Sequence, residues 1–571
     1  MDIVQRCRDG GLACVYNRPT SHTSHQHSPL LKEQAQPGPE ITPAGTASHT
    51  TFTTQVNAAI NARLGVAPQA RPSLVPMADA PLFGFLPSRR ISAAEASSDQ
   101  QVLPPRKQAD YLMEIYWHHV HPIEPFLDRQ RFNRFYLDVF EGTAPETNAD
   151  EPILFGILNT IFALTTQLQE DKPAEERERT SNRYFQRAWA GVGPDALSCD
   201  GPGSVCLVQC LLLMGRYLQC TNNSHQMWMV VGSAVRMAQS LGLHNHDSLA
   251  TSEVPPADRA FRVCLWNSCV YMDRIVSWVL GRSSTVPFVV SPQSVDPATS
   301  TYFIKTLELY EICNHIALSQ APPQHNEFSE NIGLPVLYKH RDQMKNICQL
   351  DECLTKWEKS LPPSLICDHS VAKTDVSAYR KANYLRFRLL HSRIILFRPM
   401  LIRFCQSQLE SKLRSDSNLS ENFVRDCASM CVGIAQSMVS QIDKCCQVDA
   451  SSVGLLPWWY RIFYLHLAST VLVIAHLRTE LLAPTSASKH WHDAMAGLQA
   501  HEHLSPFIKQ CVASFQSLAA KVSEITVPKQ DSSLAAPAMA NIQDIFHDMS
   551  SLDNFLFGMD EMSWIDNFVE P

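Results

Sequence analysis

Glycine, cysteine and long apolar runs are all scarce in this chain of 571 residues. Its 21 glycines are about half of the usual share of roughly 7%, which favours helices. Its 18 cysteines are too dilute for a disulfide-stabilised secreted fold, and most have the apolar neighbours typical of buried, reduced thiols. The most apolar run, 462–475, is shorter than the ~20 residues that span a bilayer. No membrane partner is expected, and the first residues lack the apolar segment of a secretory signal.

Positive charge is missing from one end of the chain, since no lysine or arginine follows Lys529. That tail holds eight of the 56 acids, so the net charge of −8 belongs to it and the rest of the chain is neutral. Its acids alternate with large hydrophobic side chains, which is typical of disordered activation regions. The alternative is a terminal helix that docks on the protein's own core. The candidate activation residues are Phe546, Phe555, Phe557, Trp564 and Phe568.

Signatures of catalysis are also lacking. There is no Gly-rich phosphate loop, no G-x-S-x-G elbow and no D-D-x-x-D motif. His118, His119 and His121 lie close together but lack the i, i+4 spacing of a helical metal site. His121 precedes Pro122, which favours an extended turn over a helix at that point. We therefore expect core or capping roles for these histidines and no enzymatic activity.

Composition divides the chain into four segments. Residues 1–16 contain two cysteines, and 17–104 have the Pro-, Ser-, Thr- and Gln-rich composition of a flexible linker. From 105 to 527 apolar residues recur at helical spacing, with breaks at Pro or Gly clusters and no strand-like alternation. Residues 528–571 form the acidic tail. The predicted fold class is all-α, with one large multi-helix domain between the linker and the tail.

The helical domain shows a series of apolar stripes and runs. Stripes at 111–116, 132–139 and 153–162 have helical spacing. Longer helices are expected at 204–220, 225–242, 258–280, 301–318, 340–360, 376–406, 420–446, 457–478 and 503–524. The apolar run 462–475 is expected to be a helix buried inside the domain.

Cys7 and Cys14 are separated by six residues in the segment QRCRDGGLACVYNRP. Two thiolates can hold one edge of a zinc site, which needs four ligands. A basic residue follows Cys7, a Gly pair lies between the cysteines, and Val-Tyr follows Cys14. The segment resembles the second half of the fungal six-cysteine binuclear zinc cluster, whose pattern there is Cys-x2-Cys-x6-Cys with a closing Tyr. The resemblance implies that Cys7 and Cys14 are metal ligands and that Tyr16 is the closing aromatic residue.

The segment departs from the family pattern at its fourth cysteine, where this chain has Val4. The first three cysteines, with their interleaved basic residues, would precede Met1, and the DNA-binding residues are expected there too. Because such a cluster folds only around its metal, zinc is expected only when the full cluster is present. Either the start codon is misplaced or an exon is missing, or the chain is a genuine short form without its own DNA contact.

Three stretches of the helical domain resemble the fungal-specific transcription factor domain, the middle homology region that accompanies this cluster. They are YWHHVHPIEPFLDRQRFNRFY at 116–136, WMVVGSAVRMAQSLGLH at 228–244 and DRAFRVCLWNSCVYMDRIVSWVLGR at 258–282. LRFRLLHSRIILFRPML at 385–401 also fits, whereas Ser283 replaces the Pro that follows Gly-Arg in the family. The resemblance implies an all-α regulatory domain.

Polar residues within these apolar helices are candidates for a buried network. Arg236, Asp273 and Arg274 are expected to pair inside the domain, because an unpaired buried charge is costly. A second interpretation makes them the polar floor of a site for a small effector ligand. Gly242 follows a predicted helix and is expected to provide its left-handed cap.

The resemblance implies a sequence-specific regulator of RNA polymerase II transcription. It would act in the nucleus, as an activator of fungal metabolic or secondary-metabolite genes. The expected partners are promoter DNA, bound through a complete N-terminus, and coactivators, bound through the acidic tail. A homodimer and a small-molecule effector are further candidates. Two other functions stay open: a transcriptional cofactor without DNA contact, and an all-α ligand-binding or catalytic protein.

Overall fold

A computed structural model describes most of the chain between residues 103 and 526, all within the compact unit Ala44–Pro571. The described ranges are 103–141, 150–192, 203–221, 224–245, 255–286, 301–320, 337–339, 342–367, 375–406, 419–448, 453–478, 481 and 484–526. Their regular secondary structure is entirely helical, which confirms the predicted all-α class.

The helices follow the apolar periodicity of the sequence closely. In chain order they are α4 (Arg106–Ile115), η1 (Tyr116–Val120), α5 (Arg129–Glu141), α6 (Glu151–Gln167), α7 (Ala174–Val192), α8 (Val205–Gln219), α9 (Ser224–Ser240), α11 (Pro256–Leu280), α12 (Thr301–Ser319), α14 (Gln343–Lys359), η4 (Pro363–Leu365), α15 (Val376–Gln406), α16 (Leu419–Val448), α17 (Trp458–Ala475), α18 (Pro484–Ala500) and α19 (Pro506–Thr526). The nine longer helices expected from the sequence are all present, with ends shifted by a few residues. Helices α7 and α18 were not expected, because their sequences are rich in polar and charged residues.

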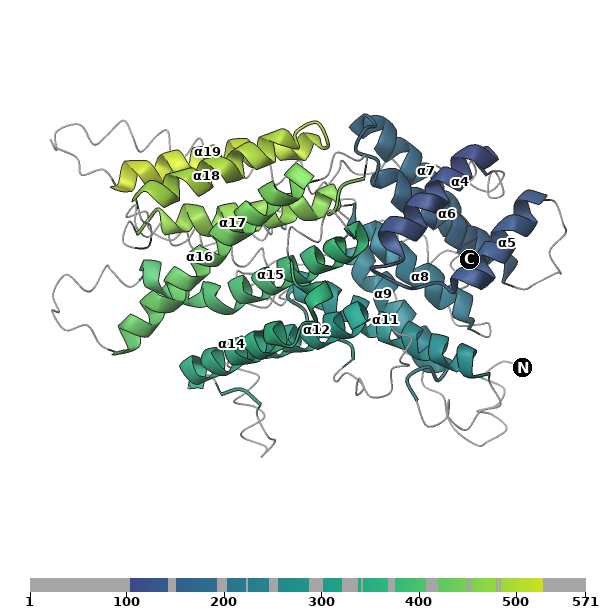
Figure 1. Ribbon diagram of the computed structural model, residues 1–571, viewed down its shortest axis with the longest axis horizontal. Coiled ribbons are helices and arrows are strands. Elements are labelled where there is room, and N and C mark those ends of the chain that lie inside the picture. The colour runs from purple at the N-terminus through teal and green to yellow at the C-terminus, as the bar shows by residue number, and fades with distance from the viewer. Residues whose placement is uncertain are drawn as a thin grey trace, which may run out of the picture. The chain divides into compact units, whose positions relative to one another are not determined.

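Successive helices pack against one another (Figure 1). Nearly all of their buried apolar residues form one large hydrophobic core, and Tyr379 and Leu455 form a small second cluster. In the first half α6 contacts α7 and α8, α8 contacts α9, and α9 contacts α11. In the second half α15 contacts α16 and α17, and α17 contacts α18 and α19. Helix α12 contacts both α11 and α15 and so joins the two halves.

Helix α17 is the central apolar helix of the second half. It is long and apolar enough to cross a membrane by length and composition, but 89% of it is buried inside the protein. Trp458 at its start donates a hydrogen bond of 2.9 Å from Nε1 to the carbonyl of Gln167, at the end of α6. Arg177 of α7 stacks over the Trp458 ring, 5.0 Å from its centroid. The expected buried helix is confirmed, and it ties the second half of the domain to the first.

Two glycines allow backbone geometry that other residues would not. Gly242 follows α9 with φ of 69°, the left-handed conformation expected for its cap. Gly215 of α8 lies against α9, where an added Cβ would come within 2.7 Å of the Val231 side chain. The close approach of α8 and α9 therefore depends on Gly215, which the sequence had not singled out.

Candidate functional site

The sequence-predicted site residues fall into two groups. Cys7, Cys14 and the tail residues Phe546, Phe555, Phe557, Trp564 and Phe568 lie outside the described residues. Arg236, Asp273 and Arg274 lie within them. No group of three or more His, Cys, Asp or Glu that could hold a metal ion occurs among the described residues.

Asp273 and Arg274 of α11 are buried, as expected, and hold the chain that follows this helix. The Asp273 carboxylate accepts hydrogen bonds from the backbone nitrogens of Thr285 and Val286, at 2.9 and 3.1 Å. Arg274 lies 3.7 Å from Asp273 and 3.3 Å from Glu311 of α12. Because backbone and acidic groups engage both side chains, the pair has a structural role.

Arg236 is exposed, so the prediction of a buried network with Asp273 and Arg274 is wrong for this residue. In α9 the buried positions next to it include Ala234, Val235 and Ala238. Position 236 projects from the opposite face, because each residue of a helix is rotated by about 100° from the preceding one. Because α9 is largely apolar, its sequence periodicity did not show that position 236 lies on the exposed face.

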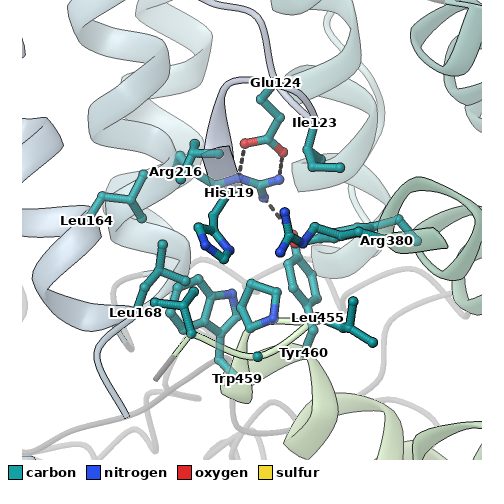
Figure 2. Close-up of a pocket in the computed structure, with 15 residues that line it drawn as sticks. His119, Ile123, Glu124, Leu164, Leu168, Arg216, Arg380, Leu455, Trp459 and Tyr460 are labelled. Atoms are coloured by element: carbon teal, nitrogen blue, oxygen red, sulfur yellow. Dashed lines mark hydrogen bonds and ion pairs between the residues drawn. The ribbon is translucent and has the colours of Figure 1, made fainter. Parts of the chain in front are cut away.

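The described residues form a different polar centre, at a small cavity (Figure 2). The cavity has a volume of about 30 Å³, enough for two or three water-sized groups, and is partly open. Its lining combines apolar, aromatic and charged side chains. The lining residues are His119, Val120, Ile123, Glu124, Leu164, Leu168, Arg216, Arg380, Tyr384, Val453, Gly454, Leu455, Pro457, Trp459 and Tyr460.

A buried ion pair between Glu124 and Arg216 forms one wall of the cavity. Glu124 lies in the loop after η1 and Arg216 lies in α8, and their side chains are only 2% and 5% exposed. Nε and Nη2 of Arg216 both face the carboxylate of Glu124, which gives a two-point contact. Arg216 also donates to Tyr460 of α17 at 2.7 Å and to Gln219. Every polar edge of this pair is thus occupied, which such burial requires.

Tyr271 of α11 connects the ion pair to a second buried cation. Its hydroxyl donates to Glu124 at 2.9 Å and accepts from Arg388 of α15 at 2.6 Å. Burial raises the pKa of Tyr271 well above its usual value, so the hydroxyl keeps the proton that it donates. Arg388 also donates to the hydroxyls of Tyr302 and Thr306, at 3.0 and 3.2 Å.

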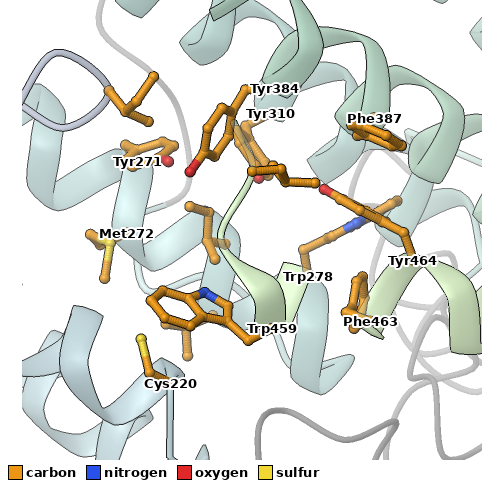
Figure 3. Close-up of a cluster of buried hydrophobic side chains, with 14 of the residues drawn as sticks. Cys220, Tyr271, Met272, Trp278, Tyr310, Tyr384, Phe387, Trp459, Phe463 and Tyr464 are labelled. Atoms are coloured by element: carbon orange, nitrogen blue, oxygen red, sulfur yellow. The ribbon is translucent and has the colours of Figure 1, made fainter. Parts of the chain in front are cut away.

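Arg388 is surrounded by aromatic rings instead of carboxylates. Its guanidinium carbon lies 5.3 to 6.0 Å from the ring centroids of Tyr271, Tyr302, Tyr310 and Tyr384. Figure 3 shows three of these tyrosines clustered in the core. Arg380, Tyr384 and Arg388 are spaced by four residues and therefore share one face of α15. The positively charged side chains of this face therefore lie both at the cavity and within the core.

A π-helical turn, η1, brings the start of the domain to the cavity. The His121 nitrogen donates to the Tyr116 carbonyl at 2.9 Å, five residues back, which widens the helix by one residue. His119 of this turn lines the cavity, and the His118 carbonyl accepts a hydrogen bond from Arg380 at 2.9 Å. The expectation of an extended turn at His121 is wrong, since its φ and ψ are −56° and −39°. The π-type hydrogen bond holds this residue helical despite the following Pro122.

The cavity lining could have been found only in part from the sequence. Arg216 interrupts an apolar helix, and the Arg-x3-Tyr-x3-Arg spacing of α15 puts its three residues on one face. Each of these two patterns indicated a charged side chain that would be buried and would therefore need a polar partner. Glu124 gave no such signal, because it lies between two prolines in a loop and 92 residues before Arg216.

Comparison with known proteins identifies the family. The fungal specific transcription factor domain matches residues 113–324, from α4 to just beyond α12. The sorbicillinoid biosynthetic cluster transcription factor 2 of Penicillium rubens is 38% identical over 544 residues, covering 92% of this chain and 78% of that protein. The chain belongs to the fungal-specific transcription factor family. It is therefore a transcription regulator and not an enzyme.

Further relatives carry related names. The sorbicillinoid biosynthetic cluster transcription factor sor3 of Hypocrea jecorina is 37% identical over 528 residues, covering 90% of this chain and 75% of that protein. A more distant relative, the positive regulator of purine utilization of Emericella nidulans, is 28% identical over 256 residues. It covers 36% of this chain and 23% of that protein. The Penicillium rubens and Hypocrea jecorina relatives, which align over 90% or more of this chain, are both named for a sorbicillinoid biosynthetic cluster.

Proposed function

We propose that this protein activates transcription of a fungal biosynthetic gene cluster for a secondary metabolite of the sorbicillinoid type. The observation that carries the proposal is the alignment with two regulators of sorbicillinoid clusters, over 92% and 90% of the chain. An alignment of this length must include most of the helical domain, so the similarity is not limited to one shared motif.

The direct test is transcript profiling after deletion and after overexpression of the gene in its own fungus. We expect a contiguous group of biosynthetic genes to lose expression on deletion and to gain it on overexpression. Opposite changes would identify a repressor. Changes in expression confined to scattered genes of nutrient use would contradict the cluster assignment. The protein would then be a regulator of general metabolism.

The acidic tail supplies the activating contact in this proposal. Its acids keep the aromatic residues hydrated, and a coactivator groove can then bind them as a short helix. Fusion of residues 530–571 to an unrelated DNA-binding domain is expected to activate a reporter gene. Replacing Phe555, Phe557 and Trp564 by Ala is expected to abolish activation, whereas replacing Ser550 and Ser551 by Ala serves as the matched control. A silent fusion, together with loss of stability when the tail is deleted, would make the tail a structural helix.

DNA contact and zinc follow in this proposal from the resemblance of residues 1–16 to a zinc cluster. Cys7 and Cys14 would be its last two ligands, and the regulator would work in the nucleus on promoter DNA. Mapping the 5′ end and the splice sites of the transcript tests whether a longer reading frame supplies Cys-x2-Cys-x6-Cys upstream and a cysteine at the position of Val4. The zinc-loaded protein made from such a transcript is expected to bind DNA that contains CGG-type half-sites. Removal of the zinc by a chelator is expected to abolish this binding. DNA binding unaffected by chelation or by Cys14→Ser would contradict the cluster.

A further inference from the structure

We propose that Cys367 and Cys445 form a reversible disulfide when the protein meets a peroxide, so that this pair of thiols is an oxidation site of the helical domain. Cys367 follows the short turn η4, and Cys445 lies in α16. The inference goes beyond the proposed function, because it concerns the chemistry of two side chains and can be tested on purified protein without transcription.

Both thiols contact one atom, the side-chain oxygen of Asn383 in α15. Sγ of Cys445 lies 3.0 Å from Asn383 Oδ1, and Sγ of Cys367 lies 3.4 Å from the same oxygen. Asn383 is fully buried, and its helix packs along α16 (Figure 1). Rotation of the two cysteine side chains, with a small movement of the segment after η4, can therefore bring the sulfur atoms to the bonding distance of about 2 Å.

The hydrogen bonds around Asn383 allow both thiols to lose their protons. Its Oδ1 accepts from Gln441 Nε2 at 2.8 Å as well as from the two thiols, which gives three donors to an oxygen with two lone pairs. Its Nδ2 donates to the carbonyl of Tyr379 at 2.8 Å. A disulfide removes the two S–H donors but keeps Gln441, so neither polar atom of the Asn383 side chain is left without a partner.

Other buried cysteines of the described helices have separate partners. Cys220 donates to the carbonyl of Arg216, and Cys431 donates to the carbonyl of Ile394. Each of these contacts lies within the hydrophobic core and satisfies a single thiol, as is usual for a buried free cysteine. The convergence of two thiols on one buried oxygen is a different arrangement, because it places the sulfur atoms next to each other.

Cys367 is the thiol that a small oxidant reaches first. It is half-buried and follows Ile366, which is 52% exposed, whereas Cys445 is buried. Burial raises the pKa of both thiols, but at Cys367 the amide donor of Gln441 and the positive charge of Arg386 act in the opposite direction. Because the thiolate is the nucleophile, the reaction is expected to begin at Cys367 and to become faster as the pH rises.

The oxidation takes place in two steps that consume one peroxide. The Cys367 thiolate attacks a peroxide oxygen and the O–O bond breaks, which leaves a sulfenic acid on Cys367 and a hydroxide that takes up the thiol proton as water. The Cys445 sulfur then attacks the sulfenic sulfur, so that the S–S bond forms and the S–O bond breaks. The leaving hydroxide takes the Cys445 proton as a second water. The two thiols lose two electrons, and the peroxide gains them.

The disulfide would connect two segments that are far apart in the chain. It joins the end of η4 to α16 and closes a loop of about 80 residues, which restricts the unfolded chain. The oxidised domain is therefore expected to unfold at a temperature several degrees higher than the reduced domain. Treatment with a dithiol reductant is expected to restore the lower unfolding temperature.

The experiment oxidises the purified, fully reduced full chain with hydrogen peroxide at low protein concentration. Remaining thiols are then alkylated, and the protein is digested with trypsin without reduction. Trypsin cleaves after Lys359 and Lys373, so Cys367 is the single cysteine of its peptide. We expect mass spectrometry to show this peptide joined to the peptide that begins at Cys445, and dithiothreitol to separate the two.

Variants assign the partner of Cys367, because Cys445 and Cys446 lie in the same tryptic peptide. Cys445→Ser is expected to abolish the joined peptide and the rise in unfolding temperature. Its hydroxyl still donates to Asn383, so the reduced variant is expected to fold, which far-UV circular dichroism checks. Cys446→Ser is the matched control, since Cys446 is the exposed neighbour, and it is expected to retain both effects.

Three results would overturn the proposal. A joined peptide that persists in Cys445→Ser and disappears in Cys446→Ser would assign the bond to the wrong neighbour. Sulfinic acid on Cys367 without a joined peptide would show that Cys445 does not reach the sulfenic sulfur. An unmodified Cys367 at a peroxide concentration that oxidises the exposed Cys348 would show that the pair is closed to the oxidant.

Discussion

The ion pair between Glu124 and Arg216 allows a quantitative test of the buried polar centre. Glu124→Gln removes the negative charge and leaves a guanidinium that is 5% exposed among the neutral groups of Gln219, Tyr271 and Tyr460. Breaking a buried pair by removing one partner typically costs about 3–5 kcal/mol. That cost is a large fraction of a typical total stability of about 5–15 kcal/mol.

The double variant separates pairing from general damage to the core. Arg216→Met alone leaves Glu124 with Tyr271 as its donor and is expected to cost about as much as Glu124→Gln. The two substitutions together remove both charges, so their combined cost is expected to fall about 3 kcal/mol below the sum. Glu352→Gln, which disrupts the exposed pair of Glu352 with Lys356, is the control and should not change stability measurably.

The measurement is equilibrium unfolding in urea of the full chain, followed by tryptophan fluorescence and far-UV circular dichroism. Coincident transitions by both probes establish that a single cooperative unit unfolds. Single-variant costs below about 1 kcal/mol, or costs that add within about 0.5 kcal/mol, would refute the inference that the pair is desolvated and coupled.

Two further predictions concern stability. Burial lowers the pKa of His391 to about 3, with Arg398 acting in the same direction, so below pH 6.5 only the unfolded chain takes up this proton. The free energy of unfolding should therefore decrease as the pH is lowered from 6.5 to 5. His391→Phe should remove about 2 kcal/mol of this decrease, as measured by urea unfolding at each pH. The same pH dependence in the variant and the original protein would contradict this. Gly242→Ala should destabilise by about 1 kcal/mol because of its φ of 69°, whereas Gly433→Ala, inside α16 with open space around it, should stabilise by a similar amount. Equal effects of the two alanines on the unfolding midpoint would show that backbone conformation is not the cause.

The sequence predicted the helices well because burial on one face leaves a periodic mark in each segment. The run 462–475 and the cap at Gly242 depend on local composition, and both were predicted correctly. Helix α18 was missed because its sequence mixes small, polar and aromatic residues without a clear apolar face. The π turn was missed because it differs from an α-helix in its backbone hydrogen bonding, such as the bond from the His121 nitrogen to the Tyr116 carbonyl, which apolar spacing does not reveal.

The candidate site was harder to predict, because its contacts join residues far apart in the chain. Arg236 had the right residue type in a recognisable helix, yet it points outward. Arg216 was as recognisable as a charge in an apolar helix, but Glu124 and Tyr460 lie 92 and 244 residues from it. One sequence contains no information on which distant polar residue meets which, so the network becomes visible only once the helices are packed.

The spread of this network along the chain has a consequence for biosynthesis. Its members range from Glu124 to Tyr460, so 336 residues must be added after Glu124 before Tyr460 is in place. At typical translation rates this takes about 20–70 s, during which Arg216 and Arg388 lack part of their final surroundings. The segment that matches the family domain, 113–324, ends before Arg388 and Tyr460 are made. A nascent chain that ends there contains Glu124, Arg216 and Tyr271 but lacks Arg388 and Tyr460, so the polar centre is completed only when α17 has been made.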